Sequence, residues 1–226
     1  MDSLSRRLEL VEERISRACS AAGRDRSEVV LVAVSKRHPA QAIDEAVSLG
    51  LSEFGENYVQ EALDKFPRPG AHLHFIGSLQ RNKVRKILPL SSLVHGVPGP
   101  SVLEAMERIA GEEGLASEFL LQLHLTDEPT KFGFSAQELP EALAMADGFR
   151  HARLRGFMAM APLEGGPEAA RPVFAKAKAL LDASRQGRSG LDILSMGMSS
   201  DLEAAISEGA THVRVGTALF GERIPA

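Results

Sequence analysis

The sequence predicts an α/β fold, a single (β/α)8 barrel of the TIM type with an extra N-terminal helix, and three observations lead to this prediction. Short apolar segments alternate with segments of helical periodicity eight times along the 226 residues. The apolar segments are rich in β-branched residues, as is typical of parallel strands that are buried on both faces. No stretch rich in Ser, Gly or Pro is long enough to separate two domains, so residues 1–226 are expected to form one domain.

The extra helix is expected at residues 3–22, because apolar residues from Leu4 to Ala18 recur at helical spacing and Gly23 can end it. The first strand is expected at residues 29–36, and Pro39 can open the helix that follows. The other strands are expected at residues 53–57, 72–77, 93–97, 117–125, 154–160, 191–197 and 211–216. The remaining helices are expected at residues 40–50, 58–66, 79–88, 101–114, 136–147, 167–184 and 200–209. A doubly wound open sheet is the alternative, although no GxGxxG motif follows the first strand.

Composition excludes several classes of function. A net charge of −4 gives no general attraction to nucleic acid or to an acidic membrane. The N-terminal segment lacks the apolar run of a signal peptide, so a cytoplasmic protein is expected. The single cysteine, Cys19, can form no internal disulfide, and no CxxC pair is available for a metal. We therefore expect no metal site, and we interpret Cys19 as a small buried side chain.

In such a barrel the functional residues lie at the C-terminal ends of the strands, and Lys36 is the last residue of the first predicted strand. Side chains alternate along a strand, so Lys36 shares a face with Val32 and Val34 and would point into the barrel with them. A lysine at an apolar mouth can have a lowered pKa, and its neutral amine is then a nucleophile toward aldehydes. A lysine that extends into solvent is the alternative interpretation.

A second candidate feature is the segment SMGMSSDLEAA, in which Gly197, Ser199 and Ser200 connect a strand to a helix. The start of a helix presents unpaired N–H groups and favours an anion such as phosphate. Ser200 and Glu203 have the spacing of a capping box, so simple helix capping is the alternative.

The last strand carries a third feature, the sequence RVGT at residues 214–217. Gly216 and Thr217 offer a backbone N–H and a hydroxyl, and barrels often bind phosphate with the loops after strands seven and eight. Arg214 has the parity of Gly216 and could point into the mouth, or it could pair with a core carboxylate. An amine, a phosphate cradle and an inward arginine on one face suit a cofactor that has both an aldehyde and a phosphate.

The sequence resembles the pyridoxal phosphate homeostasis proteins, a family similar to the N-terminal barrel of alanine racemase. The matching stretches span residues 31 to 221 and are LVAVSKRHP, FGENYVQEALDK, HFIGSLQRNK, GFMAMAP, LSMGMSSDLEAAI and VRVGTALFG. The resemblance implies a site for pyridoxal 5′-phosphate (PLP) formed by Lys36, Asn57, Met158, Ser199, Ser200, Arg214, Gly216 and Thr217.

Individual roles follow from the same resemblance. Lys36 resembles the lysine that forms the Schiff base, or internal aldimine, with PLP. The serines and the Gly216–Thr217 pair resemble the phosphate-binding residues, and either serine could make the direct contact. Arg214 resembles the arginine that faces the pyridine nitrogen, Asn57 is expected near the ring hydroxyl, and Met158 is expected against the ring or in the core.

The expected function is non-catalytic: PLP binding for vitamin B6 homeostasis, with no catalytic residue assigned. Alanine racemases add a second domain that supplies a tyrosine base, whereas the one tyrosine here, Tyr58, lies early in the chain. The resemblance also implies a monomer and, as partners, PLP and apo forms of PLP-dependent enzymes. A minimal PLP-dependent racemase or lyase is the main alternative, and a sugar-phosphate aldolase that uses Lys36 is a third. His74 is interpreted as a hydrogen-bonded strand histidine rather than as a catalytic one.

Overall fold

The computed structural model describes residues 3–126, 132–162 and 164–222, and in these ranges eight parallel strands close into a barrel. The strands are β1 (Val30–Val34), β2 (Glu53–Glu56), β3 (His72–Phe75), β4 (Ser91–Val97), β5 (Ser117–Gln122), β6 (Ala152–Met158), β7 (Ile193–Ser195) and β8 (His212–Val215). Each strand pairs with the next in the chain, and β1 closes the barrel on β8. The predicted (β/α)8 barrel is confirmed, and the open sheet is excluded.

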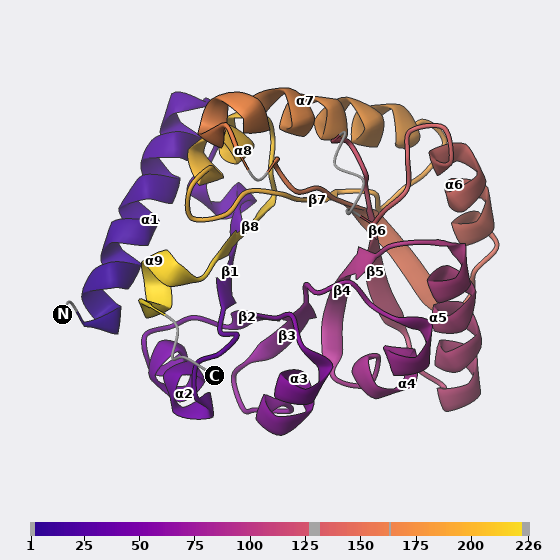
Figure 1. The fold of residues 1–226 in the computed structure, drawn as a ribbon, viewed down its shortest axis with the longest axis horizontal. Coiled ribbons are helices and arrows are strands. Elements are labelled where there is room, and N and C mark those ends of the chain that lie inside the picture. Colours follow the sequence, from indigo (N-terminus) through magenta and orange to yellow (C-terminus); the bar gives the residue numbers. More distant parts are fainter. Residues whose placement is uncertain (1–2, 127–131, 163, 223–226) are drawn as a thin grey trace.

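Helices surround the strands, as Figure 1 shows. They are α1 (Leu4–Ala21), α2 (Ala40–Ser48), α3 (Val59–Lys65), α4 (Val84–Ile87), α5 (Pro100–Glu113), α6 (Leu139–Asp147), α7 (Gly166–Ser184), α8 (Leu202–Ser207) and α9 (Thr217–Phe220). Two short 3₁₀ helices, at Arg26–Glu28 and Arg81–Lys83, complete the described elements. Most strands are shorter than predicted. The apolar, alternating pattern of side chains continues into the loops after hydrogen bonding with the neighbouring strand has ended.

The extra N-terminal helix, α1, is confirmed and lies on the outside of the barrel beside α8 and α9. The Ser3 hydroxyl caps it by accepting a hydrogen bond from the Arg6 N–H at 3.2 Å. Its apolar stripe packs on α8 and α9, and Cys19 lies buried in this stripe. Burial raises the pKa of the Cys19 thiol, which agrees with the interpretation of this cysteine as an unreactive core residue.

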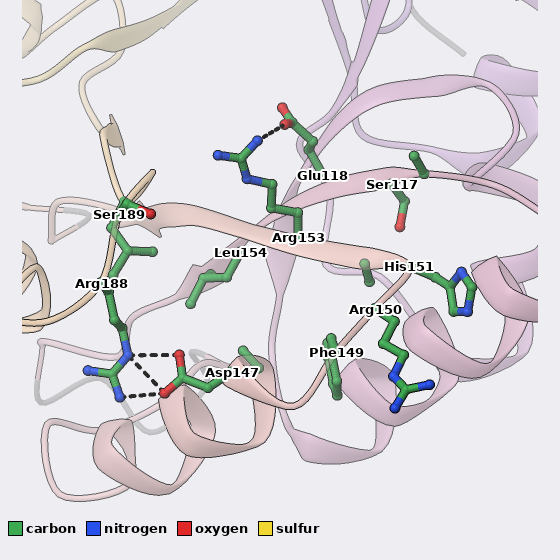
Figure 2. A pocket seen from close by; sticks show the side chains of 14 residues that line it. Ser117, Glu118, Asp147, Phe149, Arg150, His151, Arg153, Leu154, Arg188 and Ser189 are labelled. Carbon is green, nitrogen blue, oxygen red and sulfur yellow. Dashed lines mark hydrogen bonds and ion pairs between the residues drawn. The ribbon is translucent and has the colours of Figure 1, made fainter.

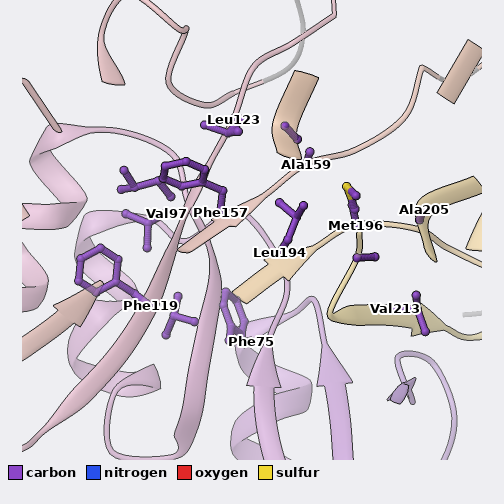
Figure 3. Close-up of a cluster of buried hydrophobic side chains, with 14 of the residues drawn as sticks. Phe75, Val97, Phe119, Leu123, Phe157, Ala159, Leu194, Met196, Ala205 and Val213 are labelled. Atoms are coloured by element: carbon purple, nitrogen blue, oxygen red, sulfur yellow. The ribbon is translucent and has the colours of Figure 1, made fainter. Parts of the chain in front are cut away.

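The core has two zones because alternate strand residues face the helices and the barrel axis. The larger zone lies between strands and helices, and Figure 3 shows part of it around Phe119, Phe157 and Leu194. Inside the barrel, a separate cluster contains Leu93, Leu120, Met158 and Ile193.

One glycine shows how closely the strands approach. Gly156 in β6 has φ 146°, and a Cβ there would lie 1.9 Å from the Ile193 carbonyl oxygen. Only glycine fits this position.

No helix in the part of the chain that the structure describes combines the length and the apolar character needed to cross a membrane.

Candidate functional site

A cavity of about 330 Å³ lies at the mouth of the barrel where the strands end, within the usual range of small-ligand sites. All eight residues that the sequence indicated line it: Lys36, Asn57, Met158, Ser199, Ser200, Arg214, Gly216 and Thr217. Val34, which the sequence predicted to point into the barrel, also lines it, whereas sequence reasoning missed four further lining residues: His38, Ile76, Met160 and Met198. Ile76 continues the inward parity of His74 in β3, so alternation could have identified it as well.

Lys36 lies in a turn two residues after β1, not within the strand as the sequence suggested. Its side chain is half-buried and lines the cavity beside Val34, so the predicted inward direction is correct. The next residue, Arg37, has φ 61°, a left-handed conformation that is uncommon for a residue with a side chain. The Arg37 N–H donates a hydrogen bond to Glu61 Oε2 at 2.7 Å, which holds this turn.

A buried lysine fixes the other side of the same turn. Lys65, the last residue of α3, donates to the Ser35 carbonyl oxygen at 2.9 Å, to Glu56 Oε1 at 2.7 Å and to Glu61 Oε2 at 2.8 Å. The Ser35 hydroxyl also donates to Glu56 Oε1, at 2.8 Å. Burial raises the pKa of Glu56, while the Lys65 ammonium and the Ser35 hydroxyl favour its charged form. This ion-pair network therefore holds the backbone on both sides of Lys36.

Arg214 forms the floor of the cavity and is 6% exposed. It donates to Ser195 Oγ at 2.6 Å and to the Ala159 carbonyl oxygen at 3.2 Å. No carboxylate of the described residues lies within ion-pairing distance, so the alternative of a core ion pair is wrong. Burial lowers the pKa of Arg214 to about 10, and Asp201 acts in the opposite direction, so the guanidinium stays charged near neutral pH.

The segment after β7 differs from the capping box that the sequence suggested. Helix α8 begins at Leu202, its N-cap is Asp201, and Ser200 lies one residue further out. Glu203 lies in the first turn of α8, but its side chain pairs with Arg14 of α1 at 2.7 Å instead of bonding the backbone of Ser200. Ser200 is therefore exposed at the cavity rather than used as a cap.

Gly197 explains how this segment reaches the cavity. It has φ 92°, and a Cβ there would lie 2.5 Å from the Ala205 Cβ. A side chain at this position would push the loop away from α8.

The cavity's chemistry fits an anionic ligand with a group that reacts with amines. No Asp or Glu is among the described lining residues, whereas Lys36 and Arg214 supply cationic groups. Three hydroxyls, from Ser199, Ser200 and Thr217, lie along the same lining. The Asn57 side-chain oxygen is buried and has no hydrogen-bond partner among the described residues, which leaves a polar atom for a ligand to satisfy.

A second cavity, of about 470 Å³, lies at the opposite end of the barrel, where β5 and β6 begin, and Figure 2 shows it. Lysine is absent from its described lining. Arg188 pairs with Asp147 at 2.7 Å, and Arg153 lies 3.9 Å from Glu118. Two of its arginines therefore already have carboxylate partners, and its described lining offers no lysine amine, so this cavity lacks the combination of groups found in the first.

The opposite mouth of the barrel also holds Glu53, the first residue of β2. Glu53 interacts with His74 at 2.7 Å and with His72 at 3.0 Å. Burial acts to raise the pKa of Glu53, but the hydrogen bonds from His74 and His72 prevail and lower it from 4.5 to about 2.

This lowered pKa predicts a specific acid sensitivity. A carboxyl group with a depressed folded-state pKa adds stability above its unfolded pKa and loses it as the pH falls. We expect Glu53 to contribute to unfolding stability above pH 4.5 and to lose that contribution between pH 4.5 and about 2. Chemical denaturation of Glu53→Gln at a series of pH values should give a flatter profile in this window than the wild type. The exposed Glu45→Gln variant is the control, and an equal flattening in it would contradict the assignment.

Comparisons with known proteins agree with the geometry. The family model for the N-terminal domain of alanine racemase matches residues 7–224. The chain is 42% identical to a pyridoxal phosphate homeostasis protein of Pseudomonas aeruginosa, over 99% of this chain and 97% of that relative. It is 37% identical to the protein of the same name in Escherichia coli, over 99% and 98%.

Solved structures give the same result. PipY of Synechococcus elongatus, in the form with PLP bound, is 36% identical and covers 97% of this chain and 100% of its own, with a TM-score of 0.83. The alanine racemase of Corynebacterium glutamicum shares the fold at 14% identity with a TM-score of 0.70, over 95% of this chain and 62% of its own.

Proposed function

This chain belongs to the alanine racemase N-terminal domain family, and from that premise we propose that it is a PLP-binding protein of PLP homeostasis that holds the cofactor on Lys36 and catalyses no turnover. One observation carries the proposal: the amine, the guanidinium and the hydroxyls indicated by the sequence all line one cavity, and no carboxylate is among its described lining residues. The names of the relatives, and the PLP in the PipY structure, support the choice of cofactor. The match over residues 7–224 supports one PLP-binding domain that spans the chain.

Each residue has a distinct part in holding the cofactor. PLP supplies an aldehyde that reacts reversibly with primary amines. Lys36 provides the amine, and the network of Lys65, Glu56 and Glu61 keeps its turn in place. Ser199, Ser200, Gly216 and Thr217 surround the position proposed for the phosphate, with either serine as a direct donor.

The ring end of the site has a different chemistry. Arg214 can only donate hydrogen bonds, so a pyridine nitrogen beside it stays unprotonated and withdraws electrons less strongly. Met158 is buried and lines the cavity, where it can pack on the ring. The buried Asn57 side-chain oxygen, which has no partner among the described residues, supports a hydrogen bond from Asn57 to the ring hydroxyl.

The alternative function, a minimal PLP-dependent racemase or lyase, needs a second acid–base group beside Lys36. Tyr58 is 47% exposed and is not among the lining residues. His38 does line the cavity, and its ring lies 5.3 Å from that of Phe220.

We expect the purified, PLP-loaded protein neither to racemise nor to deaminate amino acids, measured by chiral chromatography. Turnover that Lys36→Ala abolishes would overturn the non-catalytic assignment.

The proposed phosphate site makes a quantitative prediction. Hydrogen bonds to a charged group contribute about 1.5–3 kcal/mol each. Replacing Thr217 by valine should therefore weaken PLP binding by roughly ten- to a hundredfold. Titration of the cofactor-free protein, followed by absorbance, measures this change. Pyridoxal, which lacks the phosphate, should bind wild type and variant equally, and Ser48→Ala on α2 should bind PLP as wild type does. Equal losses for PLP and pyridoxal would contradict the placement of the phosphate.

The proposal extends to apo PLP-dependent enzymes as recipients of the cofactor, to a cytoplasmic location and to a monomer. Family resemblance supports these points. Transfer is tested by mixing the loaded protein with such an apoenzyme and following recovery of its activity, and the monomer by light scattering.

A further inference from the structure

A chain of polar side chains crosses the interior of the barrel from the proposed cofactor cavity to the opposite mouth. Arg214 on β8 donates to Ser195 Oγ on β7 at 2.6 Å. Ser195 Oγ lies 2.8 Å from Nδ1 of His95 on β4, whose Nε2 lies 2.8 Å from Nδ1 of His74 on β3. Nε2 of His74 then lies 2.7 Å from Glu53 Oε2 on β2. Four hydrogen bonds through five strands thus connect the two ends.

The chemistry of the donors gives this chain a direction. A guanidinium can only donate, so Ser195 accepts from it and its own hydrogen is available for His95 Nδ1. Burial, with the nearby His74, His212 and Arg214, lowers the pKa of His95 well below its usual value, so that its ring is neutral. A neutral imidazole that accepts at Nδ1 carries its hydrogen on Nε2 and donates it onward.

The same logic continues to a carboxylate. His74 accepts at Nδ1 from His95 and donates from Nε2 to Glu53, which can only accept when ionised. The Glu53 side chain is 26% exposed, whereas the His74 side chain is 5% exposed and His95 is fully buried. This series of hydrogen bonds therefore ends at a partly exposed carboxylate, while Arg214, the buried cation at its other end, has no carboxylate of its own among the described residues.

We propose that Ser195, His95 and His74 are positioning residues for Arg214, forming a directional hydrogen-bonded relay that aims the guanidinium at the cofactor ring and that Glu53 orients from the opposite mouth. The part of this inference that concerns the ring rests on the proposed function. The direction of the hydrogen bonds in the relay does not depend on the proposed function, because it follows from the side chains alone.

Two other roles for this cluster are less consistent with the contacts. His212 brings a third ring within 5.9 Å of His74 and 6.0 Å of His95, but no group of His, Cys, Asp and Glu in the described ranges is arranged to hold a metal ion. A purely structural role, in which these side chains only satisfy one another, requires no connection to the cavity. The Ser195–Arg214 hydrogen bond provides that connection.

The first test uses the protein without cofactor. Long-range ¹H–¹⁵N NMR of ¹⁵N-histidine-labelled protein identifies the protonated nitrogen of each ring, and His74→Gln and His95→Gln assign the signals. At pH 8, above the usual imidazole pKa of about 6.5, we expect both His74 and His95 to carry hydrogen on Nε2 and none on Nδ1. A hydrogen on Nδ1 of either ring would overturn the direction of the relay.

The second test measures the effect on bound PLP. The Glu53→Gln substitution removes the negative charge at the mouth opposite the cavity. It should shift the visible absorption maximum of the bound cofactor in the same direction as Ser195→Ala does. Both variants should weaken PLP binding, Ser195→Ala by roughly tenfold. The control is His72→Gln, because His72 bonds the other Glu53 oxygen, is 61% exposed and lies off the relay. It should match the wild type.

The outcomes separate the two proposals. A Glu53→Gln protein with the wild-type spectrum and affinity would overturn the positioning role. If Ser195→Ala does not fold, as judged by thermal unfolding, the Glu53→Gln variant at the partly exposed end of the relay still tests the positioning role. If the wild type itself takes up no PLP, the proposed function fails, whereas the NMR result on the cofactor-free protein still tests the relay.

Discussion

Replacing Lys65 by methionine is expected to lower the free energy of unfolding by about 3–5 kcal/mol, because it leaves a buried carboxylate without its partner. The Lys65 and Glu56 side chains are 8% and 0% exposed, and their ion pair is 2.7 Å long. Methionine fills a similar volume, so loss of packing is a small part of the effect. Urea denaturation at neutral pH measures the change directly.

The pH dependence of this variant has a definite sign. Burial raises the folded-state pKa of Glu56, and removal of Lys65 raises it further. A carboxyl with a raised folded-state pKa favours the folded state below its unfolded pKa and loses that contribution as the pH rises. The destabilisation of Lys65→Met should therefore be smallest in acid and increase above about pH 4.5.

Two further variants serve as controls for the buried pair. The double variant Lys65→Met, Glu56→Gln removes the unpaired charge and should recover part of the lost stability. Lys178→Met breaks an exposed i,i+4 pair with Asp182 and should cost under about 1 kcal/mol. If Lys65→Met were no more costly than Lys178→Met, the network would not be holding the Lys36 turn.

The second large effect is expected at Lys36 itself. The Lys36→Ala protein should fold, because this side chain is half-buried in a turn after β1. It should lose retention of PLP through gel filtration and bind PLP at least roughly tenfold more weakly, since the covalent linkage is gone. Absorbance of the eluted protein measures retention.

Lys83→Ala is the matched control for Lys36→Ala. Lys83 lies in the short 3₁₀ helix after β3 and is not among the cavity residues, so this variant should retain PLP as the wild type does. Equal loss in both variants would indicate nonspecific lysine modification rather than a site at Lys36.

The fold was predictable from the sequence because each strand carries its own signal. In β1, Val32 and Val34 alternate with residues that face the helices, and Lys36 continues the face of these valines. The prediction that Lys36 points inward was therefore correct, although the strand itself ends at Val34. The same parity rule placed Arg214 inside the barrel. Strand ends and parity indicated Lys36, Arg214 and the segments after β7 and β8, whereas Asn57 and Met158 were indicated by the family resemblance.

The remaining features depend on partners that are distant in the sequence. Nothing local distinguishes Lys65 on α3 from an exposed helix lysine, and its buried amine bonds Ser35, just after β1, and Glu56, the last residue of β2. The Ser200–Glu203 spacing suggested a cap, but Arg14, nearly two hundred residues away in the chain, binds Glu203 instead. His74 is hydrogen-bonded as interpreted, yet its place in the relay requires His95 and Ser195 from other strands.

Peptide mapping by mass spectrometry, after reduction of the PLP-loaded protein with borohydride, identifies the lysine that holds the cofactor. Reduction fixes any covalent linkage between PLP and a lysine, so the modified peptide identifies the residue that holds the cofactor. We expect one phosphopyridoxyl group, on the peptide that contains Lys36. A protein that carries no adduct, or one in which the adduct is on Lys83 with Lys36 unmodified, would contradict a PLP site at Lys36.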